Sequence, residues 1–263
     1  METTCQVSLD AITQNFSYFK KRVYPAQVIP VVKANAYGHG ALKITEHLHE
    51  VLGVETFAVA TLEEARELAV LFPHISILIF SRVFPSELPD VPEHAILTVG
   101  SVEDAKSISE SQSSNIRVHL NVNTGMNRLG ITSEQAQELI SWKTSNLQIE
   151  GVYSHFSSSD TSSEVVYARQ NDEFTSLVEK LRAGGFQGMA HLANSAAGLH
   201  NNQKSFDAIR LGIGLYGYDT SPEGKHQTSL QPAMTIKAPL IRIAKVSAGE
   251  SVSYAEKWQA AVD

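Results

Sequence analysis

The sequence lacks the features that would place it in a membrane, outside the cell or on a nucleic acid. Cys5 is the only cysteine in 263 residues, so no disulfide can form within the chain, which fits a reducing cytoplasm. No apolar run approaches the roughly 20 residues of a membrane helix, and the opening METTCQVSLDAITQNF lacks the basic and apolar blocks of a signal peptide. A net charge of −7 argues against nucleic acid as the main partner. We therefore expect a soluble, cytoplasmic protein without nucleic-acid or membrane partners.

The sequence also has no convincing set of metal ligands. The nearest candidates are His39, His47 and His49. His47 and His49 are two residues apart, so they would face different sides of a helix, and surface positions explain all three histidines better. Glu63, Glu64 and Glu67 have the spacing of a solvated helix face. We therefore expect no metal centre and assign these side chains to the surface.

Short apolar, β-branched segments alternate with amphipathic ones along most of the chain. Each apolar segment is too short for a helix and lacks polar alternation, which is typical of strands covered on both faces. The eight predicted strands are Val28–Val32, Thr56–Ala60, Ile75–Phe80, Ala95–Val99, Ile116–Val122, Ile149–His155, Met189–Ala193 and Ala208–Leu211. Eight strand–helix units in about 200 residues predict an α/β fold, a (β/α)8 TIM barrel. A doubly wound open sheet is the alternative, because the number of strands cannot show closure.

The amphipathic stretches between these strands have the periodicity of surface helices. They are Leu42–Leu52, Leu62–Phe72, Ser133–Trp142 and Val165–Arg182. Two helix starts carry recognisable signals. Ser101 is followed by Glu103 and Asp104, and Ser133 directly precedes Glu134.

The composition and the residue pattern of the sequence change after Gly217. We expect a barrel domain over residues 1–217, including an N-terminal strand and helix, and a second region over residues 218–263. Asp219–His226 is polar and indicates a linker, whereas Met234–Val246 and Ser251–Tyr254 are β-rich and predict the beginning of a mostly antiparallel β domain. About thirty residues of strand cannot bury their own apolar face. We therefore expect this β domain to be incomplete and the chain to be C-terminally truncated.

One lysine stands in an unusual place. Residues 31–40 read VVKANAYGHG, so Lys33 directly follows a buried strand, at the barrel mouth where catalytic residues gather. An amine there can form a Schiff base with an aldehyde cofactor, and Gly38 and Gly40 allow a tight turn. A lysine that simply ends a strand and reaches water is an equally good explanation from this chemistry alone.

The ten residues resemble the pyridoxal phosphate lysine motif of the alanine racemase family. The resemblance implies that Lys33 carries pyridoxal 5'-phosphate as a Schiff base and is one of two catalytic bases. It also implies that the hydroxyl of Tyr37 reaches the cofactor phosphate.

A second segment, NTGMNRLG over residues 123–130, matches the same family. The resemblance implies that Arg128 holds the phenolic oxygen of the cofactor and the substrate side of the site, a task that suits a planar, always charged guanidinium. Many family members have a carbamylated lysine where this chain has Asn121, which cannot be carbamylated. We hypothesise that an anion such as chloride takes the place of the carbamate.

Three further segments match at later strand ends: GVYSHF (151–156), HLANSAAG (191–198) and IRLGIGLYG (209–217). Taken alone, His155 could be a satisfied core histidine and Ser195 an ordinary helix N-cap. The resemblance instead implies that His155 lies beside the cofactor ring and that Arg210 contacts the pyridine nitrogen. The residues that it assigns to the cofactor phosphate are Asn194, Ser195, Gly212 and Ile213.

Racemisation needs a proton to leave one face of Cα and return on the other, and one lysine cannot easily serve both. The segment ESVSYAEKW resembles the family segment that carries the second base, which implies that Tyr254 acts on the barrel of a partner subunit in a homodimer. A surface tyrosine on a strand is the simpler explanation without the resemblance. Ala255 departs from the family pattern, which has glycine there.

The resemblance implies an isomerase that interconverts L-alanine and D-alanine and supplies D-alanine for cell-wall peptidoglycan. Lys33 would serve the D-isomer and Tyr254 the L-isomer. A serine or broad-specificity racemase is an alternative that these motifs do not separate. A non-catalytic pyridoxal phosphate-binding barrel is another, although Tyr254 and both arginines argue against it.

Overall fold

The computed structural model describes residues 2–111, 115–142, 146–159, 164–199, 206–220 and 228–263. The chain divides into two compact units: a barrel unit, Val7–Ala233, and a small unit formed by Met1–Gln6 and Met234–Asp263. The domain boundary that we expect after Gly217 stays a prediction. Among the described residues, no helix is both long and apolar enough to cross a lipid bilayer.

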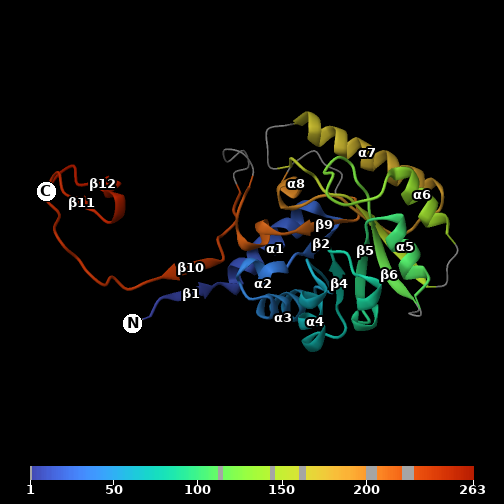
Figure 1. The fold of residues 1–263 in the computed structure, drawn as a ribbon, viewed down its shortest axis with the longest axis horizontal. Coiled ribbons are helices and arrows are strands. Elements are labelled where there is room, and N and C mark those ends of the chain that lie inside the picture. The colour runs from blue at the N-terminus through green and yellow to red at the C-terminus, as the bar shows by residue number, and fades with distance from the viewer. Residues whose placement is uncertain (1, 112–114, 143–145, 160–163, 200–205, 221–227) are drawn as a thin grey trace. The chain divides into compact units, whose positions relative to one another are not determined.

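Eight parallel strands form the barrel (Figure 1). Their order around the sheet is β2, β9, β8, β7, β6, β5, β4, β3, and the two ends meet because Val31, just past β2, bridges in parallel to Ala58 of β3. The strands are β2 (Gln27–Pro30), β3 (Thr56–Val59), β4 (Ser76–Ile79), β5 (Ala95–Val99), β6 (Ile116–Asn121), β7 (Leu147–Tyr153), β8 (Met189–His191) and β9 (Ala208–Leu211). The closed sheet confirms the predicted barrel and excludes the open sheet.

All eight predicted strands are present, with ends that differ from the predicted ones by at most 2 residues. Successive side chains of a strand point to opposite faces. Leu78 of β4 packs in the barrel interior with Ile29 and Ile96, whereas Ile77 and Ile79 pack in the core between strands and helices. Because both faces are apolar in β4, this strand shows no polar alternation. β6 is different from the prediction, since Arg117, His119 and Asn121 alternate with its apolar residues.

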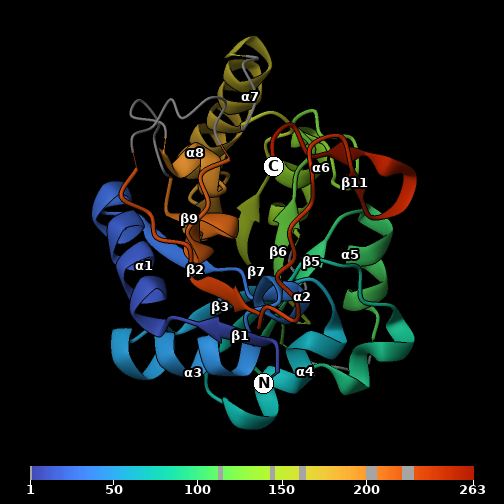
Figure 2. The ribbon, with the colours of Figure 1, turned by 90° about the vertical axis from the view of Figure 1, so that its left-hand side faces the viewer.

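Helices surround the barrel on the outside (Figure 2). They are α1 (Leu9–Val23), α3 (Ala41–Leu52), α4 (Leu62–Leu71), α5 (Val102–Ser109), α6 (Ser133–Ser141) and α7 (Glu164–Ala183), and two short segments at strand ends are α2 (Lys33–Tyr37) and α8 (Ser195–Leu199). Short 3-10 turns cover Pro85–Asp90, Ile213–Tyr216 and Tyr254–Glu256. The four predicted helices correspond to α3, α4, α6 and α7.

The two predicted helix starts have different outcomes. Ser101 caps α5 as expected, because its side chain accepts a hydrogen bond from the backbone N–H of Asp104. For α6 the cap is Thr132, which accepts from Gln135, so the predicted Ser133 is the first helical residue instead. Thr132 and Gln135 form a capping box, which satisfies two free N–H groups.

The small unit is sparsely paired. β1 (Thr4–Val7) pairs with β10 (Met234–Lys237), and β11 (Ser251–Val252) pairs antiparallel with β12 (Trp258–Gln259). The strand predicted over Met234–Val246 is therefore shorter than expected and ends at Lys237. The apolar side chains beyond it are 83–97% exposed, so no burial stabilises a longer strand there: Leu240, Ile241 and Ile243. Most of the predicted linker, Asp219–His226, lies outside the described residues.

Candidate active site

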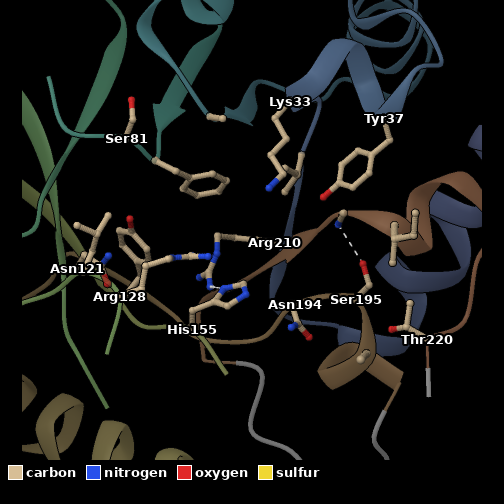
Figure 3. A pocket seen from close by; sticks show the side chains of 18 residues that line it. Lys33, Tyr37, Ser81, Asn121, Arg128, His155, Asn194, Ser195, Arg210 and Thr220 are labelled. Carbon is tan, nitrogen blue, oxygen red and sulfur yellow. Dashed lines mark hydrogen bonds between the residues drawn. The ribbon is translucent and has the colours of Figure 1, made fainter. Parts of the chain in front are cut away.

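A cavity of about 520 Å³ opens at the carboxyl ends of the barrel strands (Figure 3). Every barrel residue that the sequence assigns to the site lines it: Lys33, Tyr37, Arg128, His155, Asn194, Ser195, Arg210, Gly212 and Ile213, with Asn121 beside them. Sequence reasoning missed other lining residues, among them Ala60, Phe80 and Ser81. Their position directly after β3 and β4 is the signal that could have found them.

Lys33 begins a turn of the opposite hand to an ordinary helix. Ala34, Asn35, Ala36 and Tyr37 have φ between 50° and 54°, and Gly38 follows with φ 87°. L-residues rarely adopt the left-handed region, and a run of four is costly. The segment labelled α2 is therefore a single left-handed turn, and it needs support from its surroundings.

Side chains supply that support. The Nδ1 of His39 lies 3.0 Å from the carbonyl of Ala36 and 3.1 Å from that of Tyr37, so it carries the proton and donates to both. The N–H of Ala34 donates to a carboxylate oxygen of Glu64 over 2.7 Å. Glu63 and Glu67 are exposed as predicted. The surface prediction is wrong for His39, which is buried, and for Glu64, which is half-buried, because both side chains hydrogen-bond to the turn.

Ser195 organises the end of the cavity opposite the arginines. Its hydroxyl oxygen accepts from the backbone N–H groups of Gly212 and Gly214, each over 3.0 Å, so its own proton remains available to donate. Ser195 is not the N-cap of α8, because Asn194 fills that role by accepting from Ala197. A side chain at Gly212 would place its Cβ 2.7 Å from the hydroxyl of Tyr37, so only glycine allows this approach. Two hydroxyls therefore converge on one small space.

Burial raises the pKa of the Tyr37 hydroxyl above its usual value of about 10. The hydroxyl therefore stays protonated near neutral pH and can donate a hydrogen bond. Together with the hydroxyl of Ser195, it suits an acceptor-rich group such as a phosphate.

Arg210 lies buried on β9 without a carboxylate partner among the described residues. Its Nη1 donates to Nδ1 of His191 over 2.7 Å and to the carbonyl of His191 over 3.1 Å. Its Nη2 donates to the carbonyls of Ser154 (2.6 Å) and Leu192 (3.1 Å) and to Nδ1 of His155 (3.1 Å). Burial lowers the pKa of Arg210 to about 10, so the guanidinium keeps its charge at neutral pH.

The histidines around Arg210 are neutral. Burial, together with the charges of Arg210 and other cations, lowers the pKa of His155 to about 3, and burial lowers that of His191 well below its usual value. A guanidinium only donates, so Nδ1 of each ring must be unprotonated and Nε2 must carry the proton. His191 then donates to Nδ1 of His119 over 2.8 Å, which extends the network into the barrel interior.

Arg128 reaches the cavity from a closed loop after β6. The loop returns on itself because Val122 bridges to Ile131, and the side-chain oxygen of Asn123 accepts from two backbone N–H groups within it. Gly130 has φ +124°, and a Cβ there would lie 2.7 Å from the backbone nitrogen of Asn123. Gly130, the second glycine of the NTGMNRLG segment, is therefore required by the loop that presents the arginine.

The cavity is strongly cationic. Lys33, Arg128 and Arg210 line it, and among the described residues no aspartate or glutamate does. Such a site favours a ligand that carries negative charge, and the amine of Lys33 offers a nucleophile for a carbonyl group.

Tyr254 is the one predicted catalytic residue that does not line the cavity. It belongs to the small unit, where it is 95% exposed. The next residue, Ala255, has φ 59°, a conformation that favours glycine. This backbone explains why glycine suits the position, and alanine holds here a conformation that glycine would adopt freely; nothing in the structure explains the departure to alanine.

Residues 7–220 match the family model described as "Alanine racemase, N-terminal domain". "Alanine racemase 1" of Clostridium acetobutylicum is 36% identical over 264 residues, which cover 97% of this chain and 68% of that protein. "Alanine racemase 1" of Bacillus subtilis is 33% identical over 270 residues, which cover 100% and 69%.

Solved structures give the same result. The biosynthetic alanine racemase from Pseudomonas aeruginosa aligns with a TM-score of 0.87 and 30% identity, covering 99% of this chain and 73% of the other. The alanine racemase from Bacillus anthracis, with bound L-Ala-P, aligns with a TM-score of 0.82 and 28% identity, covering 99% and 70%.

Proposed function

Because the chain belongs to the alanine racemase family, we propose that it interconverts L-alanine and D-alanine with pyridoxal 5'-phosphate bound in the barrel cavity. In the cell this activity would supply D-alanine for peptidoglycan. The observation that carries the proposal is the composition of the cavity, in which one lysine amine, two arginines and two convergent hydroxyls meet without an acidic side chain from the described part of the chain.

The cavity fits the cofactor. Its volume of about 520 Å³ suits a small-molecule ligand. The hydroxyls of Tyr37 and Ser195 and the backbone at Gly212 and Ile213 would form a cradle for the phosphate, with Asn194 fixing the helix start beside it. The N–H of Gly212 donates to the hydroxyl of Ser195 over 3.0 Å, which places the two groups side by side. Lys33 would hold the aldehyde carbon, and the buried charge of Arg210 would face the pyridine nitrogen.

When bound, pyridoxal phosphate would supply the electron sink for charge that develops on the substrate Cα. Lys33 would exchange a proton on one face of Cα, the face used for D-alanine. Arg210 would remain charged and donate, since its pKa of about 10 lies above neutral pH. A permanent donor disfavours protonation of the ring nitrogen, which limits side reactions. Arg128 would bind the substrate side of the site as a fixed cation.

Tyr254 would provide the second base, on the face used for L-alanine, from the partner subunit of a homodimer. Its 95% exposure leaves the hydroxyl free to enter another chain's barrel. The neutral His155, whose Nε2 carries the proton, would lie beside it as a hydrogen-bond donor.

The test combines a spectrum with an activity assay. Wild-type protein loaded with pyridoxal phosphate should absorb at the edge of the visible range and convert L-alanine to D-alanine. Lys33→Ala should lose both the absorbance and at least about 10³-fold of the activity, because it removes the covalent anchor and one base. Wild-type absorbance retained in Lys33→Ala would refute the cofactor assignment. Faster conversion of serine than of alanine by the wild type would favour a broader racemase.

A further inference from the structure

We propose that Glu64 is a positioning residue for Lys33, because its carboxylate ties the left-handed turn that carries the lysine to the end of the neighbouring strand β3. This inference rests on the proposed function, in which Lys33 holds the cofactor and exchanges the proton. Glu64 itself would touch neither cofactor nor substrate.

The carboxylate of Glu64 accepts hydrogen bonds from two segments that are distant in sequence. One oxygen, Oε1, accepts from the N–H of Ala34 over 2.7 Å. The other, Oε2, accepts from the N–H of Ala60 over 2.7 Å and from that of Thr61 over 3.2 Å. Ala34 is covalently next to Lys33, and Ala60 lines the cavity. One side chain thus fixes the separation between the lysine and the strand end beside it.

A capping box alone would not use Glu64 in this way. In the box at the start of α4, the N–H of Glu64 donates to the hydroxyl of Thr61 and the N–H of Thr61 donates to the carboxylate of Glu64. The box therefore needs only one carboxylate oxygen. The bond to Ala34 spans 30 positions in the sequence and adds nothing to the capping of α4. The first oxygen of Glu64 therefore serves the turn rather than its own helix.

The turn depends on outside support because four successive L-residues, Ala34–Tyr37, hold positive φ. Asn35 and His39 also hydrogen-bond within this region, but both belong to the same loop. Among the described residues, Glu64 is the side chain outside residues 33–41 that accepts a hydrogen bond from the turn. Without it, the turn would lose its polar link to the barrel strands.

The substitution Glu64→Gln separates the two roles. An amide has only one acceptor oxygen. It should face Ala60 and Thr61, because two N–H groups can donate to it there. The amide nitrogen would then face the N–H of Ala34, so the bond next to Lys33 is lost while the cap survives. Gln135 in α6 shows that glutamine completes such a box, since its Oε1 accepts from Thr132 over 2.9 Å.

The control is Gln135→Ala, which removes the matching capping box of α6 but lies outside the cavity lining. Hydrogen–deuterium exchange of cofactor-free protein gives a readout that does not need activity. The amides of residues 33–41 should exchange at least about tenfold faster in Glu64→Gln than in wild type and in Gln135→Ala. The loaded Glu64→Gln protein should release pyridoxal phosphate faster, show an altered visible circular dichroism band and lose kcat with little change in KM.

Unchanged exchange over residues 33–41 together with an unchanged cofactor band in Glu64→Gln would overturn the proposal. A loss confined to melting temperature, equal to that of Gln135→Ala, would overturn it as well. A wild type that binds no pyridoxal phosphate contradicts the proposed function instead, and the exchange measurement on cofactor-free protein then still decides whether Glu64 holds the turn.

Discussion

The barrel unit and the small unit differ in how far they bury their side chains. In the barrel, even a guanidinium is buried, and Arg210 finds five neutral acceptors on four residues. In the small unit, apolar side chains such as Ile241 are 97% exposed, and so is nearly all of Tyr254. The barrel therefore fixes its site residues through its own packing. In the small unit, Tyr254 lies in a segment whose side chains are mostly exposed, so little packing fixes its position.

The largest expected effect is on the rate of racemisation, and it comes from a residue of the small unit. Tyr254→Phe should slow racemisation by about 10²- to 10⁴-fold, the range of one acid–base group, without changing the stability of the barrel. Lys33 remains, so D-alanine should still exchange its Cα proton with solvent D2O while L-alanine should not. Proton NMR of each isomer measures the two rates separately. Equal exchange of both isomers in Tyr254→Phe would rule out the division of the two bases.

The next effect contrasts stability in the two units. Arg210→Met should lower the free energy of unfolding by at least about 3 kcal/mol, because it leaves several buried acceptors unpaired. The matched change Ile241→Ser, at an exposed apolar position, should change it by no more than about 0.5 kcal/mol. Urea unfolding measures both. Similar losses in the two variants would contradict the view that the barrel alone carries an extensive core.

A smaller effect is the pH dependence of the free energy of unfolding. Histidines cause it in the barrel unit only, because residues 234–263 of the small unit contain none. Burial and nearby arginine charges lower the pKa of His119 to about 3, as they do for His155. Below about pH 6.5 the unfolded chain binds protons that the folded barrel does not, so stability is fully present above that pH and decreases as the pH falls.

Each such histidine should add a slope of about 1.4 kcal/mol per pH unit between about pH 6 and 4. His119→Gln keeps an acceptor for His191 and should reduce the slope by the contribution of one histidine, about 1.4 kcal/mol per pH unit. The free energy of unfolding, measured by urea titration at several pH values, checks this. A variant with the wild-type slope would show that His119 binds no extra proton on unfolding.

The smallest effect concerns Asn121, which lines the cavity together with Arg128. If an anion replaces the carbamate of related enzymes, crystals grown in bromide should show an anomalous peak between the two side chains. Asn121→Ala should then weaken anion binding and raise KM by only a fewfold. No peak at that position would refute the hypothesis.

Much of the barrel was predictable because strands with two apolar faces lack polar alternation, which is a local signal. The roles of the site residues were predicted from the family resemblance of their segments, because position near a strand end alone left the role of Lys33 open and missed Ser81. The left-handed turn was not predictable, because Ala34 and Ala36 ordinarily favour right-handed helix. Glu64 was predicted on a solvated face because periodicity shows which side of a helix is polar, but not which polar residue meets a distant loop.

The small unit was harder to predict for a different reason. The apolar residues of Met234–Val246 have the composition of a strand, but only Met234–Lys237 finds a partner strand. Strand formation depends on a neighbour that offers backbone groups and burial, and composition alone does not supply it.

The central claim is that Lys33, just beyond β2, is the residue that holds pyridoxal phosphate in the cavity lined by barrel residues. Borohydride reduction of the loaded protein, followed by peptide mass spectrometry, tests it most directly. The account predicts a reduced pyridoxyl group on Lys33 and on no other lysine. A label on another lysine with Lys33 unmodified, or no label in protein that racemises alanine, would contradict it.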